Sequence, residues 1–218
     1  MRRGPAQSPE SSLLDRLGRA GVCTSRDLAR ARSRVNRLGD DLPMFESVWL
    51  DALVQLGVLT PYQVERVEAK VSLTIGDREP LVILNQLGAG PLGETLLVRD
   101  QDGTQWAAKR LAAGTVSSAD LEARLGTLLA KMSSLVSRGA ECSVCGPVEQ
   151  IVDDADRWLL SPWCDGPSAL DLLISRGRFP AAVVAEMARQ LIQGLARLEA
   201  AGLAHGDIRP AHIRLTRK

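Results

Sequence analysis

The sequence lacks a dominant sign of charge and any long apolar run. Its 27 Lys and Arg residues nearly balance its 26 Asp and Glu residues, so overall charge gives no attraction to nucleic acid or to an anionic membrane surface. Apolar runs such as 158–160 and 181–185 fall far short of the ~20 residues that span a bilayer. We therefore expect neither nucleic acid nor a membrane among its partners. With 45% hydrophobic residues in a chain of 218, the composition predicts a soluble globular protein of one or two domains.

Cysteine is also scarce, and its 4 copies are irregularly spaced, which argues against a disulfide framework. Cys142 and Cys145 have the C-x-x-C spacing that can bind zinc or undergo redox chemistry, but no second pair completes a tetrahedral site. Residues 1–10 carry two arginines with no apolar segment after them, which predicts a disordered tail rather than a secretory signal. We therefore expect a cytoplasmic protein with ordinary thiols, and metal or redox chemistry at the C-x-x-C pair is the alternative.

A short repeat is present near the N-terminus. Residues 21–28, GVCTSRDL, match residues 57–64, GVLTPYQV, in the pattern G-V-x-T-x-x-(D/Q)-aliphatic. In each copy the glycine can end one helix in a left-handed turn, and the threonine can cap the next helix. In the second copy Thr60, Pro61 and Gln63 predict a capping box with proline at the first helical position. The repeat therefore predicts that a helix begins at Pro61.

Apolar residues at helical spacing precede both repeat glycines, so we predict two helix-turn-helix units within residues 11–72. These residues are Leu13, Leu14, Leu17, Trp49, Leu50, Leu53, Val54 and Leu56. The pattern by itself predicts a helical packing unit. Such helix pairs also resemble small modules found ahead of some bacterial kinase domains, which implies a module that docks a protein partner. DNA binding is disfavoured, because the arginines between residues 30 and 37 are spread through one segment and two aspartates follow them.

Downstream of residue 75 the periodicity changes from helical spacing to short aliphatic runs that predict β-strands. These runs occupy residues 81–84, 96–98 and 106–108. Between the first two, Gly88, Gly90 and Gly93 form a G-x-G-x-x-G pattern. A Rossmann loop leads into a helix, whereas this pattern leads into another predicted strand, and no Lys-Ser or Lys-Thr follows it as in a Walker A loop. Glycines at the tip of a hairpin allow the backbone to close over phosphates, with its N–H groups facing their oxygens.

A lysine follows at the spacing that such a hairpin needs. The segment QWAAKRL, residues 105–111, contains Ala107 and Lys109 and resembles the kinase V-A-I-K strand, in which the lysine binds phosphate. A solvated charge is the alternative for an isolated lysine. Together with the glycines, this strand predicts a nucleotide-binding segment.

The most specific pattern lies near the C-terminus. A helix predicted over 181–201 precedes GLAHGDIRPAHI, residues 202–213, which resembles the kinase catalytic loop H-R-D-L-K-P-x-N-I. Glycine loop, strand lysine, helix and this loop occur in the family's order. From Pro80 to Lys218 the sequence therefore resembles a bacterial, eukaryotic-like Ser/Thr protein kinase.

The resemblance implies an α+β fold, with a small all-α region ahead of it. We expect an N-lobe over 78–165, built from an antiparallel sheet and one helix, and the start of a helical C-lobe over 166–218. The segment RWLLSPWCDG resembles the last N-lobe strand and the adenine-binding hinge. The resemblance implies that backbone groups near Pro162 and Cys164 contact the adenine of ATP.

Several positions depart from the family pattern in the catalytic loop. Gly206 stands where most members have an arginine that contacts a phosphorylated activation loop. Asp207 matches the catalytic base, and Arg209 stands where a lysine normally neutralises the transferred phosphoryl group. His212 replaces the asparagine that holds magnesium, and an imidazole is a poor ligand for a hard cation that prefers oxygen donors. The resemblance therefore implies a weakened Mg²⁺ site, with His212 as a poor candidate ligand.

The helix after Lys109 also departs from the pattern. Our alignment places Leu125 where the family has the glutamate that pairs with the lysine. Glu122 lies one turn away and is a candidate replacement if the register of the helix differs. An unpaired buried lysine is costly, so without nucleotide we expect Lys109 to contact Glu122 or water.

The sequence ends directly after the catalytic loop, without the D-F-G aspartate that holds magnesium or the later helices. We therefore expect a truncated, pseudokinase-like regulatory or scaffold module that binds ATP but transfers phosphate poorly. One alternative is a Ser/Thr kinase completed by another chain, with Asp207 as base. Another is an adaptor that binds no nucleotide. The apolar face of the 181–201 helix is expected to be exposed, and a second copy of the chain is a candidate to cover it.

Overall fold

A computed structural model describes most of the chain and divides it into two compact units. The described residues are 9–38, 45–90, 93–112, 114–115, 118–137, 144–153 and 156–216. The first unit comprises Met1–Gly90 and Glu94–Gln105, and the second comprises Pro91–Gly93 and Trp106–Lys218. Cys142 and residues 1–8 of the expected tail lie outside the described residues, whereas Pro9 begins the first helix. The predicted domain ranges, 11–72 and 78–218, stay a prediction.

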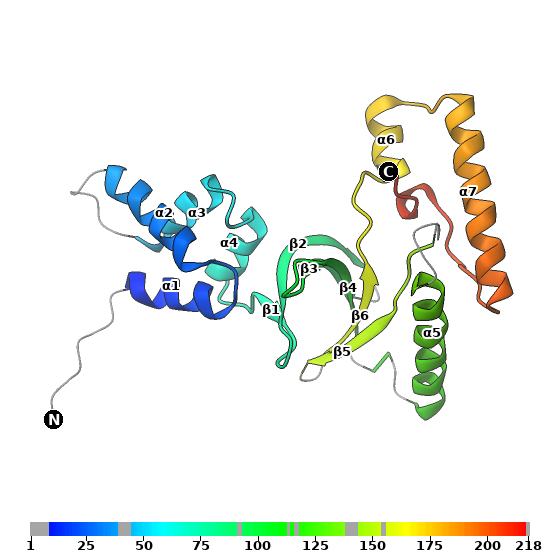
Figure 1. Cartoon of the computed structure of the whole chain (residues 1–218), viewed down its shortest axis with the longest axis horizontal. Helices are drawn as coiled ribbons and strands as arrows, with labels where there is room; N and C mark the ends of the chain where they lie inside the picture. The colour runs from blue at the N-terminus through cyan, green and yellow to red at the C-terminus, as the bar shows by residue number, and fades with distance from the viewer. Residues whose placement is uncertain are drawn as a thin grey trace. The chain divides into compact units, whose positions relative to one another are not determined.

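The first unit begins with two pairs of short helices (Figure 1). They are α1 (Pro9–Arg19), α2 (Ser25–Val35), α3 (Glu46–Gln55) and α4 (Pro61–Glu68), with a 3₁₀ turn, η1 (Asn36–Leu38), after α2. The helix beginning at Pro61 is confirmed. These helices cover the segment in which the sequence predicts two helix-turn-helix units.

The turns of both helix pairs follow from the repeat. The glycines that begin the two copies have positive φ, 66° at Gly21 and 68° at Gly57. Thr24 accepts a hydrogen bond from the backbone N–H of Asp27, whose carboxylate accepts one from the backbone N–H of Thr24. The second copy has the same reciprocal pair at the start of α4. The prediction of two capped helix-turn-helix units is therefore confirmed.

Apolar side chains of these helices share one core with the sheet that follows. Trp49 and Leu53 of α3 are fully buried, as are Leu13 and Leu17 of α1. Val82, from the second strand, belongs to the same cluster. The helices and this strand therefore gain stability from the same buried apolar surface.

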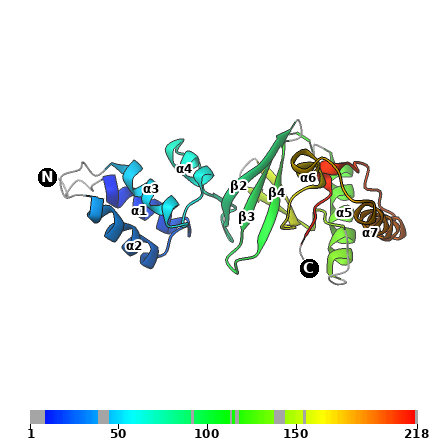
Figure 2. The same ribbon diagram turned by 90° about the horizontal axis from the view of Figure 1, so that it is seen from above.

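Three strands complete the first unit: β1 (Thr74–Ile75), β2 (Leu81–Gly90) and β3 (Gly93–Arg99). β1 pairs antiparallel with β2, and β2 and β3 lie side by side (Figure 2). Helix α4 packs against β2 through the buried amide of Gln63, whose Nε2 donates to the carbonyl of Ile83 over 2.7 Å. The Oε1 of Gln63 accepts from the backbone N–H of Thr60 over 2.8 Å. One side chain therefore caps α4 and attaches it to β2.

Replacing Gln63 with leucine is expected to destabilise the first unit by about 2–3 kcal/mol. The substitution removes the hydrogen-bond partners of the Ile83 carbonyl and of the Thr60 backbone N–H at the start of α4. Urea unfolding followed by tryptophan fluorescence measures the change. Gln55→Leu is the control, because Gln55 is exposed and contacts Arg34 on the surface, and we expect a change within about 0.5 kcal/mol. Equal losses in the two variants would contradict the role of the buried amide.

The second unit contains the other three strands, β4 (Gln105–Leu111), β5 (Glu149–Asp153) and β6 (Asp156–Pro162). Among the described strands the order in the sheet is β1-β2-β3-β4-β6-β5. β6 pairs antiparallel with both β4 and β5. The three aliphatic runs that predicted strands lie in β2, β3 and β4, so these strand predictions are confirmed.

The helices of the second unit are α5 (Ala119–Ser137), α6 (Ala169–Arg176) and α7 (Ala181–Ala200), with a 3₁₀ turn, η2 (Pro210–His212). α5 packs against β5, and α6 packs against η2. As the sequence predicts, α7 exposes apolar side chains, with Val184 50% and Ile192 66% exposed. Within the described residues, no helix has the length and apolar character needed to cross a membrane.

Candidate functional site

The glycines of the G-x-G-x-x-G pattern lie at the end of β2 and the start of β3, and the two residues between them are outside the described set. Gly93 has a φ of 127°, and a Cβ there would lie within 3.0 Å of the Arg110 carbonyl oxygen. Its backbone conformation and its neighbour therefore both require glycine. Gly88 and Gly90 differ, because a Cβ on either would meet nothing within 4 Å. Packing among the described residues gives no reason for glycine at these two positions.

The predicted lysine strand and hinge strand are neighbours in the second unit. In the β4–β6 pairing Ala107 faces Ser161, Trp106 faces Pro162 and Lys109 faces Leu159. The structure therefore brings two predicted nucleotide-binding residues, Ala107 and Pro162, to adjacent strands. Lys109 is exposed and forms no ion pair with any residue that the structure describes.

Glu122, the candidate partner of Lys109, is occupied elsewhere. Its Oε1 lies 2.6 Å from Nη1 of Arg157, which also donates to Oε1 of Gln150 over 3.0 Å. The hydrogen bond from Arg157 lowers the pKa of the Glu122 carboxyl. Arg157 is the second residue of β6, so the ion pair joins α5 to this strand, next to the edge strand β5. No sequence pattern signals Arg157, because its contact with Glu122 joins residues 35 positions apart and depends on tertiary packing.

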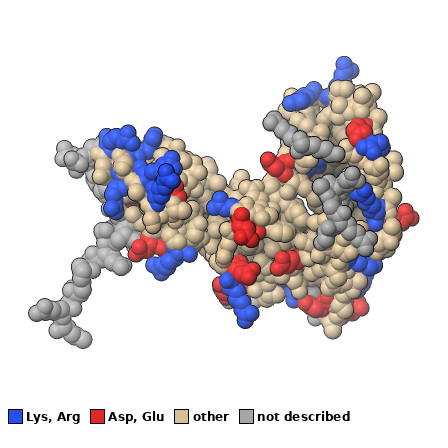
Figure 3. Space-filling view, viewed as in Figure 1, with Lys and Arg blue, Asp and Glu red and all other residues tan. Residues whose placement is uncertain are grey.

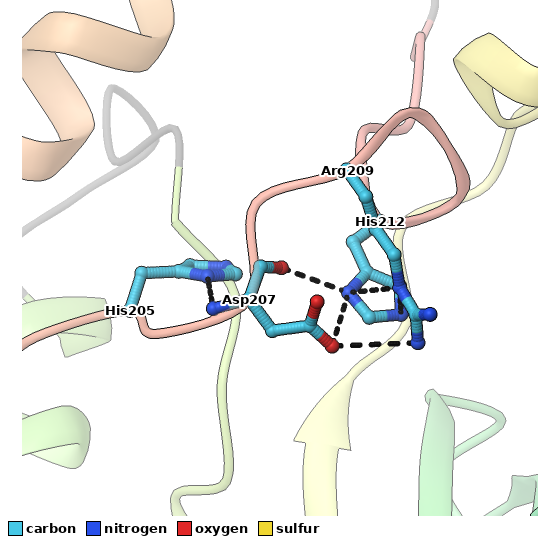
Figure 4. A network of polar contacts seen from close by, with 4 residues as sticks. All are labelled: His205, Asp207, Arg209 and His212. Atoms are coloured by element: carbon cyan, nitrogen blue, oxygen red, sulfur yellow. Dashed lines mark hydrogen bonds and ion pairs between the residues drawn. The ribbon is translucent and has the colours of Figure 1, made fainter.

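The predicted catalytic-loop residues form one polar network (Figure 4). Nη2 of Arg209 lies 3.3 Å from Oδ2 of Asp207, and Nδ1 of His212 lies 3.4 Å from the same oxygen. Nδ1 of His212 is also 3.0 Å from the backbone oxygen of Asp207. Nε of Arg209 donates to Nε2 of His212 over 3.1 Å. The side chains of all three residues are exposed, so the network is open to solvent.

The start of the same loop explains one departure from the family pattern. Gly206 has a φ of 76°, in the left-handed region that favours glycine over arginine. The backbone N–H of Asp207 donates to Nδ1 of His205 over 3.3 Å, which fixes the turn that carries the aspartate. The backbone conformation therefore explains why glycine stands at this position.

The segment after β6 contacts the segment after the catalytic loop. The guanidinium of Arg214 lies over the ring of Trp163, 4.2 Å from its centroid, and Nη1 of Arg214 donates to the Gly166 carbonyl over 2.5 Å. The backbone N–H of Leu215 donates to the Pro167 carbonyl over 3.0 Å. The predicted hinge is therefore held by residues 213–216. The contacts of Arg214 with Trp163 and Gly166 had no signal in the sequence pattern.

The donor set of the predicted catalytic loop does not suit Mg²⁺. Magnesium prefers an octahedron of oxygen donors. Here an imidazole stands at the asparagine position, and a guanidinium contacts the neighbouring carboxylate. The described residues contain no group of three or more His, Cys, Asp or Glu side chains placed to hold a metal ion.

The fold over about two thirds of the chain is that of a protein kinase. The kinase domain of M. tuberculosis PknI matches it with a TM-score of 0.53 at 18% identity, over 68% of this chain and 58% of that chain. The C20A mutant of the same domain matches with a TM-score of 0.51 at 21% identity, over 67% of this chain and 59% of that chain. At these identities the match establishes the fold, and the expected α+β kinase-like fold is confirmed.

The sequence relatives are Ser/Thr protein kinases. The chain is 30% identical over 133 residues to ppk11 of Schizosaccharomyces pombe, covering 60% of this chain and 40% of that protein. It is 28% identical over 139 residues to AfsK of Streptomyces coelicolor and to AfsK of Streptomyces griseus, covering 62% of this chain and 16% of each relative. No family model matches the chain. The chain is thus a protein-kinase-like protein that spans less than half the length of these curated relatives.

Proposed function

We propose that this protein is an ATP-binding, kinase-like module with impaired phosphoryl transfer that acts in regulation or as a scaffold. The Gly-rich segment and β4 lysine contact the phosphates, and the backbone after β6 contacts the adenine. The proposed nucleotide contacts are Gly88, Gly90, Gly93, Ala107, Lys109, Pro162 and Cys164.

The nucleotide proposal rests on two glycines, Gly88 and Gly90, for which the packing of the described residues gives no reason. Gly88 and Gly90 are exposed, and each has open space where a side chain would lie. Glycine weakens a strand, so its presence twice in the exposed half of β2 needs another cause. A phosphate chain that approaches the backbone N–H groups closely is such a cause. The exposed ammonium of Lys109 supplies a compensating charge.

Two contacts support impaired catalysis. Kinase chemistry needs the strand lysine paired with the helix glutamate, and Mg²⁺ supplies the charge neutralisation at the phosphates. Glu122 instead pairs with Arg157 at 2.6 Å. Asp207, the base position, is contacted by Arg209, and His212 occupies the position of the magnesium-binding amide. Asp207 and Arg209 could still orient a hydroxyl group, but the chain offers a poor set of oxygen donors for the metal.

Nucleotide binding with and without Mg²⁺ tests the proposal. A fluorescent ATP analogue should bind saturably, and removing Mg²⁺ with a chelator should change its Kd by less than about threefold. Lys109→Ala should weaken binding by about tenfold or more, through loss of the phosphate contact. Lys70→Ala is the matched control, because Lys70 is an exposed lysine in the helical region. Its Kd should stay unchanged.

Two results would overturn parts of the proposal. Absence of saturable binding, or equal binding by Lys109→Ala and the unaltered protein, would remove the nucleotide function and favour an adaptor. Mg²⁺-dependent phosphorylation of a generic protein substrate, lost in Asp207→Asn, would establish a kinase and overturn the impaired catalysis.

A protein partner for residues 11–72 remains part of the proposal. Lys and Arg side chains gather over this helical region in the view of Figure 3. Arg26 and Arg30 on α2 are exposed, and Arg30 lies 3.7 Å from Asp27. A solvated face of this kind is suited to a polar docking contact. A second copy of the chain over the apolar face of α7 also stays a prediction.

A further inference from the structure

Two cysteines that are far apart in the sequence meet at the predicted hinge. The Sγ atoms of Cys145 and Cys164 lie 2.7 Å apart, and either thiol can be the donor of the contact. Closing this distance to a disulfide bond of about 2.05 Å needs little movement. The pair differs from the C-x-x-C pair of the sequence, because its second member comes from the segment after β6.

The pairing of β5 with β6 brings the segments that carry the two cysteines close together. In the antiparallel β5–β6 pairing Glu149 faces Leu160. Cys145 lies four residues before Glu149, and Cys164 lies four residues after Leu160. Both cysteines therefore lie just beyond the paired strands, at equal separations along the chain from this residue pair. The hydrogen bond from the Val148 N–H to the Leu160 carbonyl, 2.8 Å long, also joins the two segments just before β5.

The surroundings favour reaction at one of the two thiols. The hydrogen bond with Cys145 and the nearby charge of Arg214 lower the pKa of the Cys164 thiol to about 7, although partial burial opposes this. About half of Cys164 is therefore thiolate at neutral pH, and the thiolate is the nucleophile. Cys145 is exposed and Cys164 is partly exposed, so a small oxidant reaches the pair.

We propose that Cys164 and Cys145 form a peroxide-reactive site, in which hydrogen peroxide converts the two thiols to a disulfide beside the hinge. The Cys164 sulfur attacks one peroxide oxygen and the O–O bond breaks, giving a sulfenic acid and hydroxide, which the proton lost by Cys164 converts to water. The Cys145 sulfur then attacks the sulfenic sulfur, the S–S bond forms and the S–O bond breaks. The leaving hydroxide takes the proton of Cys145. Two thiols and one peroxide thus give one disulfide and two waters.

Cys23 provides an internal comparison. It is 7% exposed, and burial, with the charge of Asp27 as a smaller cause, raises the pKa of its thiol to about 11. At pH 7 its thiolate fraction is far smaller than that of Cys164, although the more basic thiolate is intrinsically more nucleophilic. The net difference predicts oxidation of Cys164 on the order of 100-fold faster than that of Cys23.

Peptide mapping of the oxidised full chain tests the proposal. After exposure to hydrogen peroxide at pH 7, non-reducing digestion should give one cross-linked peptide that joins Cys145 to Cys164 and is lighter by two hydrogen atoms. Dithiothreitol should reverse the link. The reaction rate should rise about tenfold from pH 6 to pH 8, because the Cys164 thiolate population grows through pH 7.

Variants separate the two steps. In Cys145→Ser the resolving thiol is lost, so Cys164 should stay a sulfenic acid that a cyclic diketone probe labels. In Cys164→Ser both the cross-link and the labelling should disappear, whereas Cys23→Ser should behave like the unaltered protein. A cross-link from Cys142 to either partner, or oxidation of Cys164 no faster than that of Cys23, would overturn the proposal. Because the mapping uses the unaltered chain, it is decisive even where a variant folds poorly, and it is independent of nucleotide binding.

Discussion

Trp49→Ala is expected to destabilise the first unit by about 3–5 kcal/mol. Trp49 is fully buried among Leu13, Leu17 and Leu53, so its removal takes away apolar contacts and leaves a cavity. The whole stability of a typical domain is about 5–15 kcal/mol, so most of the unit's stability is at risk. Because β2 shares this core, we expect the helices and β2 to unfold together. Urea unfolding followed by circular dichroism measures the loss.

Trp49→Phe is the matched control for this substitution. The buried indole N–H of Trp49 has no hydrogen-bond partner among the described residues. Phenylalanine removes this unsatisfied donor while it keeps most of the ring, so two opposing effects nearly cancel. We expect a change of about 1 kcal/mol or less. A loss as large as that of the alanine variant would show that the indole N–H makes a contact that these residues do not account for.

Features set by neighbours in the sequence were predictable. The capping box at Thr60 forms as expected, and the expected cap at Thr24 is also a capping box. Both involve residues three positions apart. The strands β2, β3 and β4 followed from short aliphatic runs. In each case the interacting groups lie within one turn or one strand, where local geometry decides which atoms meet.

Features set by register between distant segments were not predictable. The sequence suggested Glu122 as partner of Lys109, but strand β6 supplies Arg157 at 2.6 Å. The contact of Cys145 with Cys164 depends on how β5 aligns with β6, which no local pattern specifies. Partners of this kind become known when the pairing of the strands is known.

Gly166→Ala is expected to destabilise the second unit by about 3–4 kcal/mol. Gly166 has a φ of 139°, which L-residues rarely adopt, and a Cβ there would lie within 3.0 Å of the Leu215 carbonyl oxygen. Because the obstacle is backbone, the residues after the catalytic loop must move. This movement should break the contact of Arg214 with Trp163, and the fluorescence of Trp163 should change before global unfolding.

Gly177→Ala separates the cost of the positive φ from the cost of the steric clash with the backbone. Gly177 also has a positive φ, 84°, but a Cβ there would meet nothing within 4 Å. Its substitution therefore carries the backbone cost alone, about 1–2 kcal/mol. The difference between the two variants measures the close approach of Gly166 to Leu215. If the variants lose equal stability, the contact between the hinge and residues 213–216 is not tight. If Gly166→Ala also weakens binding of the ATP analogue while Gly177→Ala does not, that contact positions the hinge for the nucleotide.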